Sequence, residues 1–155
     1  MHYLIDGHNL IPHVAGLSLA DPDDESKLIE RLNAFARARK ARITVFFDRA
    51  PKGMAGTRLH GNLKAVFVPV NSTADQAIMQ ALAKLKSAAR NVTVVTSDRM
   101  IQAAARARHA SILTSQAFAR QMEEAAQTTQ PATQDAMSAE ELQDWLKLFD
   151  QPKSP

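Results

Sequence analysis

The sequence contains no cysteine, so disulfide bonds, zinc–thiolate sites and cysteine nucleophiles are excluded. Aromatic residues make up only 5% of the chain, which means that the core must be largely aliphatic and rich in alanine. No stretch approaches the roughly 20 apolar residues that a transmembrane helix needs, and the N-terminus lacks the basic and apolar regions of a signal peptide. These absences favour a soluble protein without membrane contact, and we expect it to be cytoplasmic.

Acidic residues are scarce in the middle of the chain. Most of the 19 lysines and arginines lie between Lys27 and Arg120, where the acids are Glu30, Asp48, Asp75 and Asp98. A basic body with isolated carboxylates suits a polyanionic partner such as nucleic acid. A solvated basic surface without a partner would give the same composition.

Short apolar, β-rich segments alternate with segments of helical periodicity. The expected strands are 3–5, 43–47, 65–68, 92–95 and 111–113, and the expected helices begin near residues 21, 73, 100 and 115. The first of these helices has Asp21 as its predicted cap, with Pro22 at its first position. Residues 49–62 have no clear periodicity, so we interpret them as a loop. The alternation predicts an α/β fold with a mainly parallel sheet that is covered on both faces.

The end of the chain has a different composition. Residues 127–137 are rich in Gln, Thr, Ala and Pro, which predicts a linker between a domain of residues 1–126 and a terminal helix of residues 138–150. The helix would begin with a capping box and carry Leu142, Trp145, Leu146 and Phe149 on one face. This apolar face predicts packing on its own domain, a homodimer contact or docking to a protein partner.

Four aspartates are predicted to meet at one edge of the sheet. Asp6, Asp48 and Asp98 each follow an expected strand, and the carboxyl ends of parallel strands lie on the same side. Asp75 lies at the start of a helix that follows a strand, so it is directed to the same edge, and Asn9 would supply an amide there. Each of these acids, considered alone, is also explained by an ordinary role in a turn or as a helix cap.

Clustered carboxylates repel one another unless protons or cations neutralise them. A site built from oxygen ligands suits Mg²⁺ or Mn²⁺. Such an ion binds a phosphate oxygen and activates a water molecule. Other α/β sites match less well, because the chain lacks a dinucleotide-binding glycine fingerprint, a phosphate-binding P-loop and a nucleophile elbow.

Several motifs resemble those of one known family. They are Leu4-Ile5-Asp6-Gly7-His8-Asn9-Leu10-Ile11, Val45-Phe46-Phe47-Asp48, Thr73-Ala74-Asp75 and Val95-Thr96-Ser97-Asp98-Arg99. In this order they resemble the NYN-domain proteins of the YacP-like branch of the PIN-like nuclease superfamily. The resemblance runs from about residue 2 to residue 124. It implies a three-layer α/β/α sandwich with a central, mainly parallel sheet.

The resemblance also implies an activity and residue roles. It implies an endonucleolytic ribonuclease in which a metal-activated water leaves a 5′-phosphate and a 3′-hydroxyl. Asp6, Asp75 and Asp98 would bind Mg²⁺ or Mn²⁺, Asn9 would orient a ligand or the water, and Asp48 would be an additional acid of the site. We interpret His8 as structural, because a single histidine carries little information about a site.

Basic residues beside this edge are candidates for substrate binding. Arg49, Lys52 and Arg58 lie in the segment that leaves the strand ending at Asp48, and Arg99 follows Asp98. We expect them to hold phosphates of RNA, although DNA is also compatible because no feature reads a 2′-hydroxyl. The segment of residues 49–61 lacks aromatic side chains, so base recognition is expected to be weak or to depend on a partner.

Two other functions fit the same residues. A PIN-like fold that keeps its basic surface without catalysis would be an RNA-binding module. A chain recruited through its terminal helix would be a subunit of an assembly. Metal-dependent cleavage distinguishes the nuclease from both alternatives.

Overall fold

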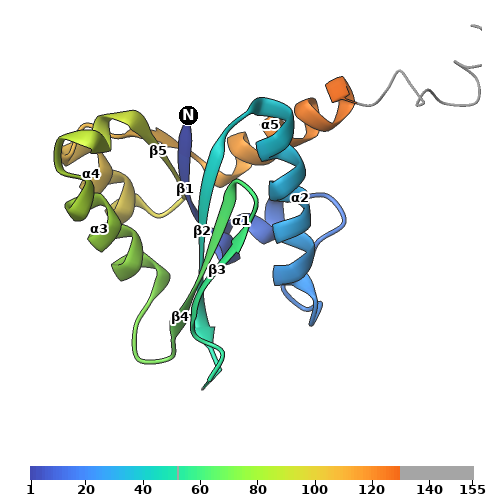
Figure 1. The fold of residues 1–155 in the computed structure, drawn as a ribbon, viewed down its shortest axis with the longest axis horizontal. Coiled ribbons are helices and arrows are strands. Elements are labelled where there is room, and N and C mark those ends of the chain that lie inside the picture. Colours follow the sequence, from blue (N-terminus) through green and yellow to red (C-terminus); the bar gives the residue numbers. More distant parts are fainter. Residues whose placement is uncertain (52, 130–155) are drawn as a thin grey trace, which may run out of the picture. The chain divides into compact units, whose positions relative to one another are not determined.

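The computed structural model describes residues 1–51 and 53–129 (Figure 1). Its centre is formed by strands whose two faces are both buried. Six strands form one sheet in the order β3-β4-β2-β1-β5-β6. Their bounds are β1 (His2–Asp6), β2 (Arg42–Ala50), β3 (Gly56–His60), β4 (Leu63–Pro69), β5 (Val92–Val95) and β6 (Ser111–Leu113). Neighbouring strands are parallel except β3, which is antiparallel to β4. The predicted mainly parallel sheet is confirmed.

Helices cover both faces of this sheet. Helices α3 (Ala74–Leu85) and α4 (Arg99–Ala107) lie on one face, and α1 (Gly7–Leu10), α2 (Asp24–Arg39) and the beginning of α5 (Ser115–Thr129) lie on the other (Figure 1). Two 3₁₀ segments, η1 (Ile11–His13) and η2 (Lys86–Asn91), complete the described elements. The result is the three-layer α/β/α arrangement expected from the sequence.

The two faces of the sheet have different cores. On the α3–α4 face the buried side chains are aliphatic apart from Phe46, and Ile78, Leu82 and Ile101 cluster with Val94 of β5. On the opposite face several of the scarce aromatic residues meet. The ring of Phe118 lies 5.1 Å from that of Tyr3 and 5.0 Å from that of Phe35. Such pairs add about 0.5–1.5 kcal/mol each to area burial, and here they join β1 to α2 and α5.

The prediction of a loop over residues 49–62 is wrong for half of its length. Strand β2 continues to Ala50, and Gly56–His60 form the edge strand β3. No residue of β3 is buried, so the strand lacks the hydrophobic alternation that would mark it in the sequence. The sequence signal for this hairpin is the turn Gly61-Asn62, which lies between the paired residues His60 and Leu63. Glycine is favoured at such a turn because the position requires a positive φ, here 66°.

Helix α2 begins at Asp24, not directly after Asp21 as the capping pattern predicts. The carboxylate of Asp21 accepts a hydrogen bond from the backbone N–H of Asp23 at 2.8 Å. Aspartate readily forms such local turns, and this turn delays the helix. By contrast, the predicted cap of the next helix is confirmed, because the hydroxyl of Thr73 accepts a hydrogen bond from the N–H of Gln76 at 3.1 Å.

Residues Met1–Met122 form one compact unit that contains all six strands. Helix α5 begins in it and runs to Thr129, three residues into the segment predicted as a linker. The rest of that segment, the predicted helix of residues 138–150 and Lys52 lie outside the described residues. Within the described part of the chain, no helix is long and apolar enough to cross a membrane.

Candidate active site

Four aspartates lie at the carboxyl edge of the three central strands. Asp6 ends β1, Asp48 lies near the end of β2, and Asp98 follows β5. These strands are neighbours in the sheet, which is the condition for the predicted convergence. Asp75 occupies the first turn of α3. The predicted acidic residues therefore come from four separate segments and approach one edge.

The electrostatics show that these aspartates influence one another. Burial raises the pKa of Asp6 to about 6, and the charges of Asp75 and Asp48 add to this increase, while a backbone hydrogen bond from Asn9 opposes it. The pKa of Asp75 is also raised, first by burial and then by the charges of Asp98 and Asp48. The edge is therefore a region of unfavourable negative charge, which a bound cation would relieve.

The close contact between β1 and β2 explains why glycine follows Asp6. A Cβ atom on Gly7 would lie 2.3 Å from Cε1 and 2.6 Å from Cδ1 of Phe47. Helix α1 can start directly after the strand because this space is left empty. The carboxylate of Asp6 caps that helix, accepting a hydrogen bond from the N–H of Asn9 at 3.4 Å.

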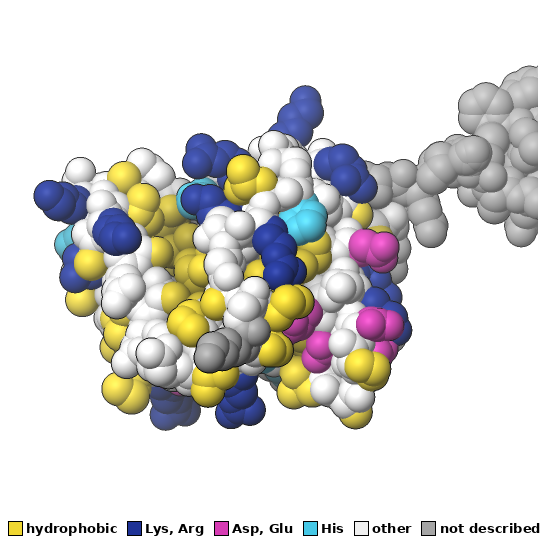
Figure 2. All heavy atoms as spheres, turned by 60° about the horizontal axis from the view of Figure 1, so that its bottom comes forward, with side chains coloured by type: hydrophobic (Ala, Val, Ile, Leu, Met, Phe, Trp, Pro, Cys, Tyr) yellow, Lys and Arg dark blue, Asp and Glu magenta, His cyan; other side chains and the backbone are white. Residues whose placement is uncertain are grey.

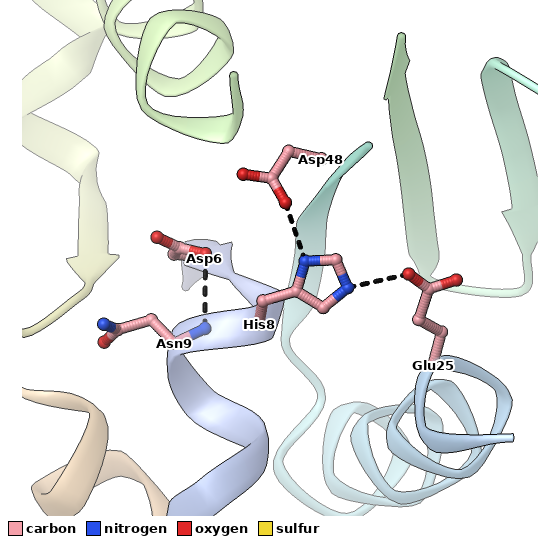
Figure 3. A network of polar contacts seen from close by, with 5 residues as sticks. All are labelled: Asp6, His8, Asn9, Glu25 and Asp48. Carbon is pink, nitrogen blue, oxygen red and sulfur yellow. Dashed lines mark hydrogen bonds and ion pairs between the residues drawn. The ribbon is translucent and has the colours of Figure 1, made fainter. Parts of the chain in front are cut away.

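His8 bridges two carboxylates (Figure 3). Its Nδ1 lies 2.8 Å from Oδ1 of Asp48, and its Nε2 lies 2.7 Å from Oε2 of Glu25 on α2. Burial lowers the pKa of His8, but the hydrogen bonds and charges of Asp48 and Glu25 outweigh it, so that the pKa is raised overall. Both ring nitrogens donate only in the imidazolium form. The raised pKa of His8 favours this form, in which the ring would donate to both acids and help to hold Asp48 in place.

Glu25 carries no signal in the sequence that would place it in this network. No spacing rule relates residues 8, 25 and 48, because their contact depends on how α2 packs over α1. The cluster of acids at residues 21–25 is explained equally well by the first turn of a helix. Only the three-dimensional arrangement assigns Glu25 to the site.

Asn9 joins three parts of the site. Its Oδ1 accepts hydrogen bonds from the N–H of Ser97 at 3.0 Å and from the hydroxyl of Ser115 at 2.5 Å. The Ser115 side chain is fully buried, and both serines were absent from the predicted site. The amide Nδ2 of Asn9 has no hydrogen-bond partner within the described part of the chain. This donor is therefore unused within the described residues, and the role of Asn9 in orienting a ligand stays a prediction.

Asp98 acts as a helix cap. Its Oδ1 accepts hydrogen bonds from the N–H groups of Met100 at 2.8 Å and Ile101 at 3.3 Å. The interpretation of this aspartate as a helix cap is therefore correct for one of its two carboxylate oxygens. Oδ2 has no hydrogen-bond partner in residues 1–51 and 53–129, which leaves one oxygen for another role.

The predicted basic residues occupy different positions around this edge. Arg49 is exposed and has a φ of 61°, at a bulge where the pairing of β2 with β4 shifts. Arg99 is exposed at the start of α4. The guanidinium of Arg58 lies 4.4 Å over the Phe67 ring. None of these arginines forms an ion pair with an acid in the described residues, so their charges remain available.

The side chains at this edge have the right ligand atoms for a hard divalent cation, but their positions do not form a coordination site. The four aspartates offer oxygen ligands, and the raised pKa values of Asp6 and Asp75 reflect burial and the charges of neighbouring carboxylates. Among the described residues, however, no group of three acidic or histidine side chains is positioned to hold one ion. Coordination by three carboxylates would require side-chain movement upon binding.

Comparisons with known proteins identify the family. A family model described as the YacP-like NYN domain matches residues 3–150. The crystal structure of Rae1 (YacP) from Bacillus subtilis is 21% identical, with a TM-score of 0.72 over 99% of this chain and 91% of that chain. A mutant of the same protein gives 22% identity and a TM-score of 0.67, over 82% and 77% of the two chains.

No match was found among curated proteins. The similarity to Rae1 establishes the shared fold, and the family model covers nearly the whole chain, including the four motifs singled out in the sequence. The chain therefore belongs to the YacP-like NYN domain family of PIN-like nucleases.

Proposed function

We propose that this chain is a divalent-metal-dependent ribonuclease that cleaves RNA internally at the acidic edge. The observation that supports this most directly is the convergence of Asp6, Asp48, Asp75 and Asp98 at one end of the sheet, where burial and neighbouring carboxylates raise the pKa of Asp6 and Asp75. Asp6, Asp75 and Asp98 are the proposed metal ligands. A bound Mg²⁺ or Mn²⁺ would activate a water molecule and offset the negative charge on the phosphate.

The surrounding residues have distinct proposed roles. The Nδ2 of Asn9 orients a phosphate oxygen or the attacking water, and Asp48 adds a carboxylate whose position His8 maintains. Arg49, Lys52, Arg58 and Arg99 hold flanking phosphates of the RNA. The water oxygen bonds to phosphorus while the bond to the 3′ oxygen breaks, and the leaving oxygen takes up a proton.

This function is tested by incubating a labelled structured RNA with the purified protein in Mn²⁺, in Mg²⁺ and in EDTA. The proposal predicts internal cuts in at least one metal, 5′-phosphate ends on the products and intact RNA in EDTA. Cleavage that continues in EDTA would contradict metal dependence, and 3′-phosphate ends would contradict the proposed bond cleavage.

One observation supports a second candidate function. One oxygen of Asp98 is engaged in capping α4, and no three acidic or histidine groups among the described residues are positioned to hold an ion. A non-catalytic RNA-binding module would also have these features. It would bind RNA without cutting it in either metal, and its affinity would survive alanine at Asp6 and Asp75.

The first prediction concerns His8. His8→Asn places an amide near the position of Nδ1, which contacts Asp48, whereas His8→Gln places it near Nε2, which contacts Glu25. If the role of His8 is to position Asp48, His8→Asn retains most of the kcat and His8→Gln lowers it by about tenfold, as is typical for residues that orient ligands. Steady-state cleavage kinetics measure this. Equal losses of kcat in both variants, or a change in KM alone, would contradict this positioning role.

The second prediction concerns Arg49, whose positive φ is normally a property of glycine. Arg49→Gly should change the free energy of unfolding by less than about 1 kcal/mol. It should weaken RNA binding and reduce the slope of log affinity against log salt by about one. Lys40→Gly is the matched control, because Lys40 has a φ of 53° at the far end of α2. An equal effect of both variants on RNA affinity would exclude a specific role for Arg49.

A further inference from the structure

A groove with a volume of about 470 Å³ lies between helix α2 and the β3–β4 hairpin. Figure 2 shows hydrophobic, acidic, basic and histidine side chains close together on this part of the face. Its walls combine apolar surface from Ile29, Met54 and Phe67 with Glu30 and Asn33 of α2 and with the basic residues Arg58 and His60 of β3. Mixed lining of this kind suits a planar heterocycle with a polar edge.

The groove shares one residue, Glu25, with the hydrogen-bond network of the acidic edge. Glu25 belongs to its wall and also accepts the hydrogen bond from Nε2 of His8 at 2.7 Å. The other ring nitrogen of His8 contacts Asp48 at 2.8 Å. His8 therefore connects a residue of the groove wall to Asp48 of the proposed cleavage site, and this connection is the reason to place a neighbouring nucleotide of the RNA in the groove.

One wall of the groove offers a flat stacking surface. The Phe67 ring stacks on Phe47, with centroids 5.3 Å apart and an interplanar angle of 25°. The guanidinium of Arg58 lies 4.4 Å over Phe67 and donates a hydrogen bond to the carbonyl of Met54 at 3.3 Å, which fixes its orientation. Because Phe67 is itself only 8% exposed, a base would stack on the guanidinium plane, as single-stranded RNA bases commonly do.

The polar groups of the groove select for hydrogen-bond donors. Glu30 and Asn33 lie one helical turn apart on α2, so their side chains are neighbours on its surface. Glu25 and Glu30 would repel a phosphate, which directs the RNA backbone elsewhere and leaves a base as the group that enters. A carboxylate accepts two adjacent N–H groups most effectively. Guanine presents such a pair at N1 and N2, whereas adenine presents one amino group beside an acceptor.

We propose that this groove is a subsite for a guanine base of single-stranded RNA, next to the phosphodiester that is cleaved. The carboxylate of Glu30 accepts hydrogen bonds from N1–H and N2–H of the base, and Asn33 supports the same edge. Arg58 stacks on the ring, in place of the phosphate contact given for it above. This subsite rests on the proposed ribonuclease function and gives it a preference for sequence that the basic residues alone would not provide.

The test uses fluorescence anisotropy of three labelled RNA 10-mers in EDTA. Each is polyuridine with one central guanosine, inosine or adenosine. We expect the guanosine oligonucleotide to bind about tenfold more tightly than the adenosine one, as for a bidentate base contact. Inosine, which lacks the N2 amino group, should fall between them. Glu30→Gln should remove the preference without loss of fold, since Glu30 is exposed.

Asp23→Asn is the control, because it removes one negative charge from the start of α2 outside the groove. It should leave the guanosine preference unchanged. Equal binding of the three oligonucleotides, no binding of any of them, or a preference that survives Glu30→Gln would overturn the subsite. This measurement needs no cleavage, so it tests the subsite independently of the nuclease activity. A guanosine preference in a protein that does not cleave RNA would mean that the proposed function fails while the subsite stands.

Discussion

Asp6→Asn is expected to lower RNA cleavage by roughly a thousandfold while making the fold more stable at neutral pH. Loss of a metal-binding carboxylate removes several kcal/mol of transition-state stabilisation, and each 1.4 kcal/mol corresponds to about a tenfold change in rate. Asparagine is as good a helix cap as aspartate, so the hydrogen bond from the N–H of Asn9 is retained. The loss of activity should therefore occur without unfolding.

The stability gain follows from the pKa of Asp6. Because burial and the charges of Asp75 and Asp48 raise this pKa from 3.8 to about 6, the folded state favours the protonated carboxyl. The stabilisation that this provides is fully present below about pH 4 and is lost as the pH rises through about 6. At pH 7 without metal, the ionised carboxylate destabilises the fold by an amount on the order of 1–2 kcal/mol, allowing for solvent screening.

Urea unfolding of the wild type and Asp6→Asn, in EDTA at pH 4 and pH 7, measures this difference. We expect Asp6→Asn to exceed the wild type in free energy of unfolding by more at pH 7 than at pH 4. Asp23→Asn serves as the control, because Asp23 is exposed at the start of α2 and is not among the charges that influence Asp6. A variant that is less stable than the wild type at pH 7 would contradict the predicted destabilisation by the ionised Asp6 carboxylate.

Gly7→Ala is expected to have the largest effect on the fold. Its Cβ atom would lie 2.3 Å from Cε1 of Phe47, and the carbonyl oxygen of Phe46 would lie at 3.1 Å. Overpacking of this kind typically costs about 1–3 kcal/mol. Since α1 carries His8 and Asn9, the displacement should also separate these side chains from Asp48 and Ser97 and lower the kcat.

A double-mutant cycle identifies the cause of this effect. Phe47→Leu removes the ring atoms that clash with the new methyl group, although it leaves a cavity of its own. If the clash accounts for the effect, Gly7→Ala costs less in the Phe47→Leu background than in the wild type, by more than about 0.5 kcal/mol. Additive effects would mean that Gly7 is needed for another reason.

The parts of the site that could be predicted are those that topology determines. Asp6, Asp48 and Asp98 follow buried strands, and parallel strands bring their carboxyl ends to one edge whatever the details of packing. Asp75 reaches the same edge because its helix follows a strand. Thr73 could be identified as a cap because a cap depends on residues only three apart.

Contacts that depend on long-range packing could not be predicted. Glu25 reaches His8 only after α2 has docked on the sheet, and Ser115 reaches Asn9 from more than a hundred residues away in the sequence. Strand β3 was missed because its residues face solvent and its order comes from pairing with β4. Each of these features is determined by a partner element, and its own residues carry no periodic signal.

The central claim is that the acidic edge is a catalytic metal site. Its most direct test is cleavage of a labelled structured RNA in Mn²⁺ by the wild type and by an Asp6→Asn/Asp75→Asn double variant, with circular dichroism to confirm that both are folded. We predict internal cleavage by the wild type and none by the folded variant. Equal cleavage by the two proteins would contradict the assignment of these aspartates, and RNA binding without cleavage by either would favour the binding module.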